Sequence, residues 1–299
     1  NLLQQALALR KRAKTKGVLF HAHLPRSELL CALALKEASF VVTRHNSERF
    51  FPKAPKAISR VLSRFVLGKA FACISISQAV SDYLENIKEI NKSTKLFVIH
   101  YGLKQVIPKK RIENRISNKT RRIGTVARLV PQKNIPLLLN ALQLLKTQGE
   151  FDLQLSIAGD GYLHKKLRLM TENLHIDELV TWTGKISKVE TFYDGIELFV
   201  LTSNYEGFGL VLLEAMSFGV PVVARRISAI PEVLGQSHPG LIESDCPLEL
   251  AAKITELLSN SNARQKCLAY QSEQLLNFSI EKTQHAHGFV YDQMLKENA

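Results

Sequence analysis

Two glutamates eight positions apart are the residues of this sequence best suited to chemistry. They lie in the stretch YEGFGLVLLEAMSFGVPVV, which runs from Tyr205 to Val223, with Glu206 beside a Gly-Phe-Gly sequence and Glu214 inside an apolar run. A carboxylate in an apolar run needs a partner if that run packs into a core. Glu214 could therefore accept hydrogen bonds from two vicinal hydroxyls of a ligand, such as those of a ribose, or it could pair with a nearby arginine or a helix end.

The residues around these glutamates follow the order strand, loop, helix. LFVLTS (198–203) is typical of a buried strand, and LVLLEAMSF is typical of a helix that stops at Gly219 and Pro221. This order places free backbone N–H groups from Phe208 to Leu210 at a helix N-terminus, beside glycines that let a ligand approach closely. We therefore expect a phosphate site here.

A second charged loop follows a predicted strand at VARLVPQKN. It carries Arg128 and Lys133 at the carboxyl end of that strand, where α/β folds bind ligands. Two fixed cations could hold a diphosphate and stabilise the charge that it gains on leaving. Either cation alone would be an ordinary loop charge.

Short β-rich runs alternate with helical patterns along the chain, as in a sheet of parallel strands joined by helices. The predicted strands are 17–23, 40–45, 72–77, 96–102, 122–128, 153–159, 179–184, 198–203 and 220–225. The fold class is therefore α/β, with two Rossmann-like, doubly wound domains that face each other across a cleft.

A polar segment, KQVIPKKRIENRISNKTR, separates two groups of strands and predicts a linker at 104–120. The first domain, residues 1–103, then holds about four strands, and the second part of the chain is considerably longer. The sequence also begins with Asn rather than Met. We therefore expect the first domain to be incomplete at its N-terminal side.

Positive charge is concentrated in the first part of the chain. Residues 1–120 contain 23 Lys and Arg against 7 Asp and Glu, whereas residues 121–299 contain 17 against 20, within a net charge of +13. Such asymmetry favours an anionic partner, either nucleic acid, an acidic lipid surface or a phosphorylated substrate, unless the basic surface is merely solvated. Because no zinc spacing or recognition motif accompanies the charge and aromatics make up only 7% of the chain, we do not expect nucleic acid.

The composition, 45% hydrophobic and 22% charged, is that of a globular protein. No apolar run approaches the roughly 18 residues that span a bilayer, and the N-terminus lacks the pattern of a secretory signal. The four cysteines lie far apart without a CxxC pair, which favours a reducing compartment over a disulfide framework or a metal clip. We therefore expect a cytoplasmic protein, either free or peripheral on the cytoplasmic face of the membrane.

The segment SERFFPKAPKAISRVLSRFVLGK, residues 47–69, combines helical spacing with many cations. Its apolar residues are Ile58, Val61, Leu62, Phe65 and Val66, and its cations are Lys53, Lys56, Arg60, Arg64 and Lys69. A basic amphipathic helix with aromatics can lie on an anionic membrane. The alternative is a helix that covers the sheet and leaves its basic side in water.

The motifs VARLVPQKN, IAGDGY, TWTGKI and SNYEGFGLVLLEAMSFGVPVVARRISAIPEVLG, in this order and spacing, resemble the retaining glycosyltransferases of family 4, which have the two-domain GT-B fold. The resemblance continues less distinctly through HAHLPRS, VVTRHN, ISISQAVSDYL and VIHYGL. It implies that residues 121–277 bind a nucleotide-sugar donor and that a C-terminal helix, 278–299, crosses back toward an acceptor-side first domain. The family's opening strand and glycine-rich loop do not occur before HAHLPRS.

The resemblance implies a role for each residue of the donor site. Glu206 would contact hydroxyls of the transferred sugar, and Glu214 would hold the ribose of the nucleotide. Arg128 and Lys133 would clamp the diphosphate. The remaining donor contacts would come from a glycine-bearing loop and from glycines that shape the base and sugar pocket: Gly207, Phe208, Gly209, Leu210, Gly159, Gly161 and Gly184.

Three histidines of the first domain lie on its predicted strands. His45 of VVTRHN matches the family's histidine near the sugar and the acceptor, unless it is a structural histidine at a strand end. His21 and His23 alternate along a predicted strand and could indicate a metal, but without a carboxylate partner packing and hydrogen bonding are favoured. The expected catalytic residues are thus His45, Glu206, Arg128 and Lys133.

The implied reaction moves a sugar from a nucleotide diphosphate sugar to a hydroxyl acceptor, with retention at the anomeric carbon, in the synthesis of a cell-envelope glycan or glycolipid. No Asp-x-Asp occurs in the sequence, which favours a site without metal or other cofactor, where Arg128, Lys133 and a helix N-terminus supply the counter-charge. The expected partners are the nucleotide sugar, a glycan or lipid-linked acceptor, and an anionic membrane surface. Three alternatives stay open: a same-fold nucleotide-sugar epimerase, a nucleotide-sugar-binding module without catalysis, and a nucleic-acid binder, which would explain the basic first part of the chain but lacks a recognition motif.

Overall fold

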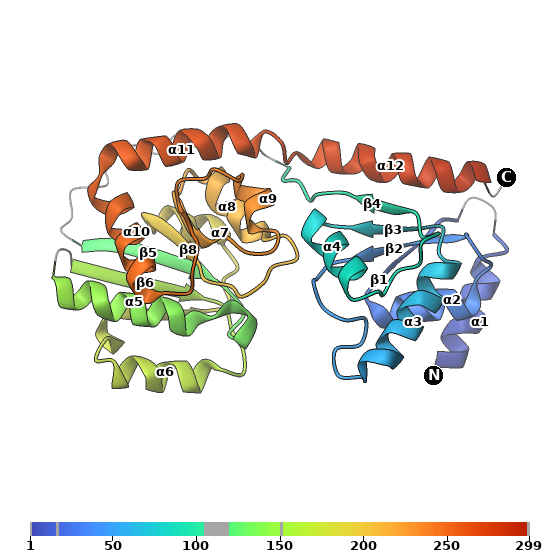
Figure 1. Cartoon of the computed structure of the whole chain (residues 1–299), viewed down its shortest axis with the longest axis horizontal. Helices are drawn as coiled ribbons and strands as arrows, with labels where there is room; N and C mark the ends of the chain where they lie inside the picture. The colour runs from blue at the N-terminus through green and yellow to red at the C-terminus, as the bar shows by residue number, and fades with distance from the viewer. Residues whose placement is uncertain (1, 16–17, 105–119, 150–151, 298–299) are drawn as a thin grey trace. The chain divides into compact units, whose positions relative to one another are not determined.

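The computed structural model describes residues 2–15, 18–104, 120–149 and 152–297. The chain divides into two compact units (Figure 1). The first unit comprises Asn1–Gly102 and Ile280–Ala299, and the second comprises Leu103–Ser279. Of the predicted linker at 104–120, residues 105–119 lie outside the described residues.

The second unit contains a sheet of six parallel strands in the order β10-β9-β8-β5-β6-β7. Its strands are β5 (Thr120–Val126), β6 (Asp152–Ala158), β7 (Val180–Gly184), β8 (Leu198–Leu201), β9 (Val222–Arg225) and β10 (Leu241–Ile242). Five of them match predicted runs, and β10 was missed because two residues give no recognisable pattern. The chain winds from β5 outward to β7 and then returns to the other side of β5 for β8, so this sheet is doubly wound.

Helices cover both faces of this sheet (Figure 1). They are α5 (Ile135–Gln148), α6 (His164–Asn173), α7 (Val189–Asp194), α8 (Leu210–Ser217), α9 (Ile230–Leu234), α10 (Pro247–Ser259) and α11 (Ser261–Leu275), with 3-10 turns η2 (Pro131–Lys133) and η3 (Asp177–Leu179). The helix α5 has proline in its first turn and ends at Gly149, whose φ of 68° suits glycine. Its leucines join α10 and strands β5, β6 and β8 in one buried core.

The first unit contains four parallel strands in the order β1-β2-β3-β4. The strands are β1 (Phe20–His23), β2 (Phe40–Arg44), β3 (Ala72–Ser75) and β4 (Leu96–Val98), and the helices are α1 (Leu2–Arg12), α2 (Pro25–Ala34), α3 (Lys56–Lys69), α4 (Gln78–Asn86) and α12 (Ile280–Glu297). Because each connection steps to the next strand with the same hand, α2, α3 and α4 lie on one face of the sheet. The other face receives α12, which buries Val290 and Met294 against Val41 and Ile74.

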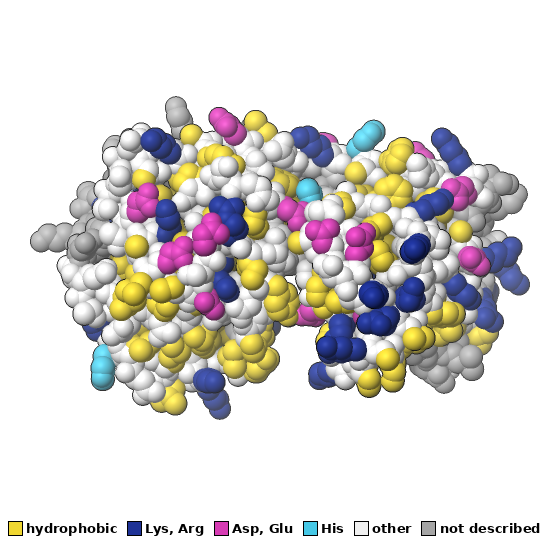
Figure 2. All heavy atoms as spheres, viewed as in Figure 1, with side chains coloured by type: hydrophobic (Ala, Val, Ile, Leu, Met, Phe, Trp, Pro, Cys, Tyr) yellow, Lys and Arg dark blue, Asp and Glu magenta, His cyan; other side chains and the backbone are white. Residues whose placement is uncertain are grey.

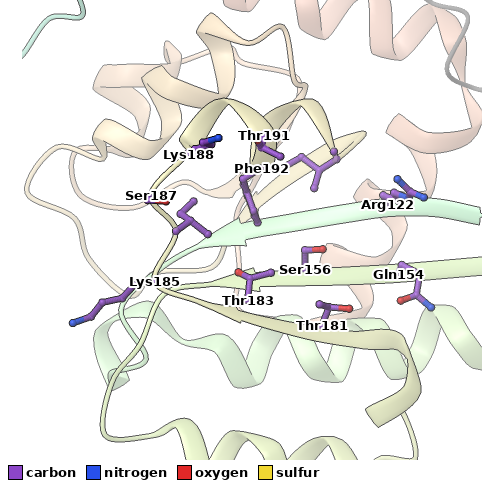
Figure 3. Close-up of a pocket in the computed structure, with 13 residues that line it drawn as sticks. Arg122, Gln154, Ser156, Thr181, Thr183, Lys185, Ser187, Lys188, Thr191 and Phe192 are labelled. Atoms are coloured by element: carbon purple, nitrogen blue, oxygen red, sulfur yellow. The ribbon is translucent and has the colours of Figure 1, made fainter.

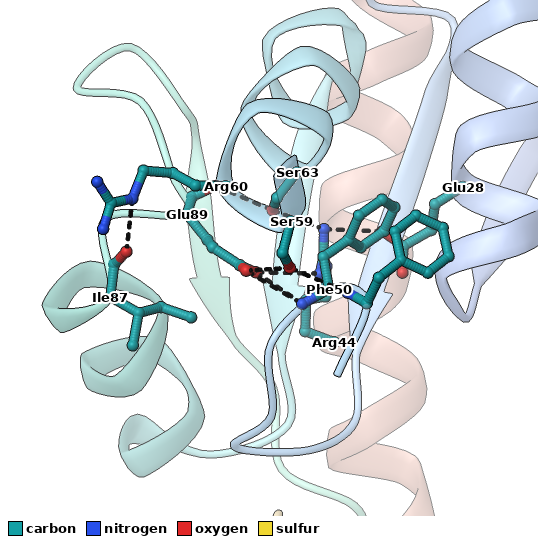
Figure 4. Close-up of polar contacts among 9 residues, drawn as sticks. Glu28, Arg44, Phe50, Ser59, Arg60, Ser63, Ile87 and Glu89 are labelled. Atoms are coloured by element: carbon teal, nitrogen blue, oxygen red, sulfur yellow. Dashed lines mark hydrogen bonds and ion pairs between the residues drawn. The ribbon is translucent and has the colours of Figure 1, made fainter. Parts of the chain in front are cut away.

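A buried arginine at the end of β2 joins three segments of the first unit (Figure 4). Arg44 Nη2 lies 3.0 Å from Glu28 Oε2 of α2 and donates to Ser63 Oγ of α3 at 3.1 Å. Its Nη1 lies 4.0 Å from Glu89 Oε2, and its guanidinium carbon lies 4.4 Å from the centre of the Phe50 ring. The arginine therefore ties the end of β2 to the helices on one face of the sheet.

The helix α3 turns hydroxyls, not apolar side chains, toward this network. Ser59 Oγ donates to Glu89 Oε1 at 2.7 Å, and Ser63 Oγ donates to the backbone oxygen of Glu89 at 3.0 Å. The buried side of α3 thus holds Ser59 and Ser63 beside Val66 and Leu67. Of the five apolar residues that follow helical spacing in this segment, three are exposed: Ile58 (51%), Val61 (65%) and Phe65 (38%).

Glu28 is completely buried beside Arg44, with Glu89 as the second carboxylate of the network. Burial raises the pKa of the Glu28 carboxyl from 4.5 to about 7, against the lowering effect of Arg44. The folded chain therefore binds this proton more tightly than the unfolded chain does. The contribution of Glu28 to stability is complete below the unfolded pKa of about 4.5 and is lost as the pH rises through about 7.

We expect Glu28→Gln to raise the free energy of unfolding at pH 8, by roughly 1–3 kcal/mol relative to wild type, and to change it less near pH 5. Urea unfolding followed by far-ultraviolet circular dichroism at the two pH values measures this. The fluorescence of Trp182, which lies in the second unit, serves as an internal reference. Glu37→Gln, at an exposed carboxylate of the first unit, is the matched control. If Glu28→Gln made the chain less stable than wild type at pH 8, the expectation would be contradicted.

Candidate functional site

The reversal of strand order in the second sheet brings two predicted loops to the same place. Strands β5 and β8 pair directly, with Ile123 opposite Leu198 and Gly124 opposite Phe199. The loops that follow these two strands, 127–134 and 202–209, therefore leave the same edge of the sheet side by side. In doubly wound folds, ligands bind at this point.

Hydrogen bonds join the C-terminal part of the first loop to the N-terminal part of the second. Gln132 Nε2 donates to the backbone oxygen of Tyr205 at 2.9 Å, and the backbone N–H of Asn204 donates to the backbone oxygen of Gln132 at 2.7 Å. Thr202 Oγ1 donates to the backbone oxygen of Lys133 at 3.0 Å. The cationic loop and the loop that carries Glu206 thus form one connected structure.

The structure brings Lys133 and Glu206 together as an ion pair. Lys133 Nζ lies 2.5 Å from Glu206 Oε1, which also accepts from Ser203 Oγ at 2.6 Å. Glu206 is only 6% exposed, and Lys133 compensates the cost of burying its charge. Arg128, on the same loop, is exposed and donates to Gln132 Oε1 at 3.2 Å.

The helix α8 begins at Leu210, where the sequence predicts a phosphate site. Gly209 precedes it with a φ of 96°, a conformation that suits glycine. Phe208 is buried, and its ring packs against Phe278 with 5.8 Å between ring centres. The buried ring holds the loop in place, while the helix N-terminus keeps the polarity that attracts anions.

Among the described residues, the partner of the Glu214 side chain is a tyrosine, and not an arginine or a helix end. Tyr193 donates from its hydroxyl to Glu214 Oε2 at 3.0 Å and stacks on Phe218 with 5.4 Å between ring centres. Burial raises the pKa of the Glu214 carboxyl, although the Tyr193 hydrogen bond opposes that shift. Among the described residues, no hydrogen bond to Glu214 Oε1 is recorded, so this oxygen keeps its capacity to accept from a ligand.

The predicted glycines of IAGDGY let two loops lie in contact. A Cβ on Gly159 would lie 2.0 Å from the Ala127 backbone oxygen, and one on Gly161 would lie 2.4 Å from that of Leu129. Gly159 also donates from its backbone N–H to the backbone oxygen of Gly184 at 2.7 Å. The glycines therefore allow the approach that positions the loop of Arg128.

His45 belongs to the first unit, whereas the predicted donor residues belong to the second. It follows β2, and its ring nitrogens lie within hydrogen-bond distance of His23 and of Tyr101. His21 bonds to Thr43. Among the described residues, no group of three or more His, Cys, Asp or Glu side chains is arranged to hold a metal ion.

Sequence reasoning missed several residues that support the predicted ones. Gln132, which joins the two loops, lies next to Lys133 in VPQKN, so its position in the motif could have identified it as a site residue. Tyr193 lies in an ordinary helical pattern and Ser203 ends a predicted strand, so neither gave any sign of a contact with Glu214 or Glu206.

A groove of about 640 Å³ lies on the sheet of the second unit, beside α7 (Figure 3). Polar side chains of β5, β6 and β7 line its floor, and Lys185 and Lys188 come from the loop before α7. Phe192 and Ile196 give it an apolar side. None of the residues predicted from the sequence lines this groove.

Comparison with known proteins identifies the relatives of this chain. The family model for glycosyl transferases group 1 matches residues 106–274. The chain is 29% identical over 220 residues to an uncharacterised glycosyltransferase of Methanocaldococcus jannaschii, covering 72% of this chain and 58% of that protein. It is 24% identical over 298 residues to N-acetyl-alpha-D-glucosaminyl L-malate synthase of Bacillus anthracis, covering 94% and 76%.

A third relative, O-antigen chain mannosyltransferase B of Escherichia coli, is 33% identical over 163 residues, which cover 53% of this chain and 42% of that protein. The chain thus spans about half the length of the first and third of these relatives. Among solved structures, Anabaena HepE in complex with UDP and glucose has a TM-score of 0.80 at 20% identity, covering 96% of this chain and 80% of that one.

The predicted α/β fold is confirmed, because structural neighbours that cover nearly the whole chain are GT-B glycosyltransferases. The family model covers more than half of the chain and includes both loops of the candidate site. This chain therefore belongs to the glycosyl transferases group 1 family.

Proposed function

We propose that this chain transfers a sugar from a nucleotide diphosphate sugar to a hydroxyl acceptor, with retention at the anomeric carbon. The observation that carries the proposal is the meeting of a cationic loop and a helix N-terminus where the second sheet reverses. Arg128, Lys133 and the first amides of α8 supply positive potential for a diphosphate. The UDP and glucose in the complex of Anabaena HepE support a nucleotide-sugar donor.

Glu214 and Glu206 bind the two sugar rings of the donor in this proposal. Glu214 Oε2 already accepts from Tyr193, which leaves Oε1 to accept from a ribose hydroxyl. Glu206 lies beside Lys133 at the cationic loop, where its carboxylate would accept from hydroxyls of the transferred sugar. Gly207, Phe208, Gly209 and Leu210 would offer backbone groups to the phosphates between them.

The chemical step breaks the bond between the anomeric carbon and the diphosphate oxygen and forms one to the acceptor oxygen. The acceptor proton passes to the leaving phosphate, on the same face of the sugar. Arg128 and Lys133 stabilise the negative charge that grows on the leaving group. The counter-charge comes from these side chains and the helix N-terminus, so the proposal includes no metal and no other cofactor.

The acceptor is proposed to be a glycan or lipid-linked hydroxyl of the cell envelope. The relative from Escherichia coli is named as an O-antigen chain mannosyltransferase, which supports this class. The exposed face of α3 supports a membrane-associated acceptor. Figure 2 shows Lys and Arg side chains gathered beside apolar ones over this part of the first unit.

The α3 surface combines the exposed side chains of Ile58, Val61 and Phe65 with neighbouring cations. In the part of the chain that the structure describes, no helix is long and apolar enough to cross a membrane. On the basis of the exposed apolar side chains and cations of α3, we propose a peripheral association in which α3 lies on an anionic membrane surface at the cytoplasmic face, with its apolar side chains among the headgroups.

Replacing Glu214 by alanine is expected to weaken nucleotide binding about tenfold or more, because a charge-assisted hydrogen bond to the ribose is lost. Thermal-shift titration with UDP, GDP and ADP and their sugar conjugates, without divalent metal, measures this, since a ligand of the folded state raises its stability. Glu172→Ala, at an exposed carboxylate of α6, is the control. Equal stabilisation of the Glu214 variant and wild type by the same nucleotide would count against the ribose contact.

Replacing Glu206 by glutamine is expected to lower the turnover of the donor by about 100-fold while nucleoside diphosphate affinity changes less than about threefold, because this carboxylate acts on the sugar. Release of nucleoside diphosphate from the donor, with water as acceptor, measures turnover, and thermal shift measures affinity. Unchanged turnover would exclude the proposed role. Loss of nucleotide affinity with turnover intact would assign Glu206 to the phosphates instead.

Membrane binding is expected to depend on both the charge and the apolar side chains of α3. Wild type should sediment with vesicles that contain phosphatidylglycerol and detach as salt rises, since salt screens surface charge. Val61→Ser with Phe65→Ser should bind at least about fivefold more weakly. Leu276→Ser, at an exposed leucine of the second unit, is the control, and equal binding of wild type to neutral vesicles would contradict the electrostatic part.

A further inference from the structure

The groove beside α7 lies on a face of the second sheet that is covered only in part (Figure 3). Phe192 of α7 and Ile196 pack onto β5, where a Cβ on Gly124 would lie 2.7 Å from the Ile196 side chain. Beyond β5, the groove exposes the neighbouring strands β6 and β7. Parallel strands of this kind of sheet are normally buried on both faces, so an open face is a departure from the usual architecture.

Polar side chains alternate with apolar ones on these two strands. The leucines and the isoleucine of β6 are buried in the core that α5 shares, whereas Gln154 and Ser156 are half-buried on the groove side. Thr181 and Thr183 of β7 are exposed on the same side. Hydroxyl and amide groups thus stand at the positions that a covering helix would require to be apolar.

Most of these polar side chains can still bind a ligand. Among the described residues, no hydrogen bond is recorded for the side chains of Gln154, Ser156 and Thr181, whereas the Thr183 hydroxyl donates to the backbone oxygen of Ile157 at 3.2 Å. Ser156 lies opposite Thr181 in the parallel register, on strands that are roughly 4.8 Å apart. The floor of the groove therefore offers closely spaced donors and acceptors to a ligand with several hydroxyls.

Positive charge lies at both ends of the groove. Arg122 is at one end, and Lys185 and Lys188 are at the other (Figure 3). None of the described residues that line the groove is a carboxylate, although residues 121–299 contain 20 Asp and Glu against 17 Lys and Arg. The Glu197 carboxylate, which accepts from the Arg122 backbone N–H at 3.4 Å, is held by two arginines outside the groove at 2.9 and 3.8 Å. The groove thus favours an anion.

Hydroxyl groups between cations fit an anionic oligosaccharide. Sugar hydroxyls can bond to the Ser, Thr and Gln side chains, and acidic groups of the glycan can pair with guanidinium and ammonium groups. Single-stranded nucleic acid has the charge but also needs aromatic surfaces on which its bases stack. Among the described residues of the groove, the aromatic one is Phe192, which is only 8% exposed and offers no such surface.

We propose that this groove binds an anionic oligosaccharide, on the face of the second sheet and separately from the donor site at the N-terminus of α8. The inference goes beyond the proposed function, because binding here requires neither a nucleotide sugar nor sugar transfer. The acidic group of the glycan is a carboxylate or a phosphodiester, since an arginine such as Arg122 can pair with either one.

Calorimetric titration of the full chain with three oligomers of equal length tests the ligand class. Oligogalacturonate supplies carboxylates, its methyl ester keeps the other hydroxyls without the charge, and oligo(ribitol phosphate) supplies phosphodiesters. At least one of the two anionic oligomers should bind, more weakly as salt rises, and the methyl ester should bind about tenfold more weakly or less than oligogalacturonate if that is the one bound. The oligomer that binds more tightly identifies the acidic group. Failure of both to bind, or equal binding of the methyl ester, would overturn the proposal.

Charge-matched variants test the place of binding. Arg122→Gln with Lys188→Gln should weaken binding about tenfold or more, because two charge-assisted hydrogen bonds are lost. Lys165→Gln with Lys166→Gln, at exposed lysines of α6 on the opposite face of the sheet, removes the same charge and should weaken binding less than about twofold. Equal weakening by the two pairs would assign the binding to net charge and overturn the proposal.

Backbone amide spectra of wild type cover the case in which the groove variant does not fold. The oligomer should shift the resonances of Gln154, Ser156 and Thr181, and it should bind equally well when nucleoside diphosphate is present. Shifts confined to α3, displacement by nucleoside diphosphate, or tighter binding of a single-stranded DNA oligomer of the same charge would each overturn the proposal. If no nucleotide stabilises the chain, the proposed function fails, and the oligomer titrations alone decide the role of the groove.

Discussion

The direct pairing of β5 with β8 is the constraint on which the candidate site depends. It sets the loop of Lys133 beside the loop of Glu206, although about 70 residues of chain separate them. Once the loops are adjacent, each stabilises the other: Glu206 is buried and requires a counter-charge, and Lys133 is the cation within reach.

The first unit uses a buried charge network for a comparable purpose. Arg44 is the last residue of β2, immediately before His45, and its guanidinium is held by Glu28, Glu89 and Ser63. Isolated buried charges are costly, and a matched set persists only when its geometry is fixed by the surrounding chain. The network thus fixes the end of β2, immediately before His45, and it explains why α3 presents serines to the interior and leaves apolar side chains outside.

Much of the fold could be predicted from the sequence because buried parallel strands are continuous apolar runs, and nine of the ten strands that the structure describes were located in this way. The positions of Glu206, Arg128 and Lys133 at strand ends were likewise readable from the order of strand and loop. The helix α3 is a case that the sequence left open. Its spacing allowed either a helix that covers the sheet or one whose apolar residues face a membrane. The structure leaves Ile58 exposed, because the buried side of the helix faces Glu89 and Arg44. No pattern in the sequence indicates that the buried side of this helix packs against charged and polar groups.

The hydrogen-bond partners of the site residues could not be predicted from the sequence, for a related reason. Contacts such as Tyr193 with Glu214, or Tyr101 with His45, join residues 21 and 56 positions apart that meet only after the sheet forms. Family resemblance directs attention to His45, but its hydrogen-bond partners, His23 and Tyr101, could not be predicted from the sequence. A ring whose two nitrogens are both occupied has no capacity left for a hydroxyl unless one bond breaks. Any ligand hydroxyl that forms a hydrogen bond to a ring nitrogen of His45 must therefore displace either Tyr101 or His23.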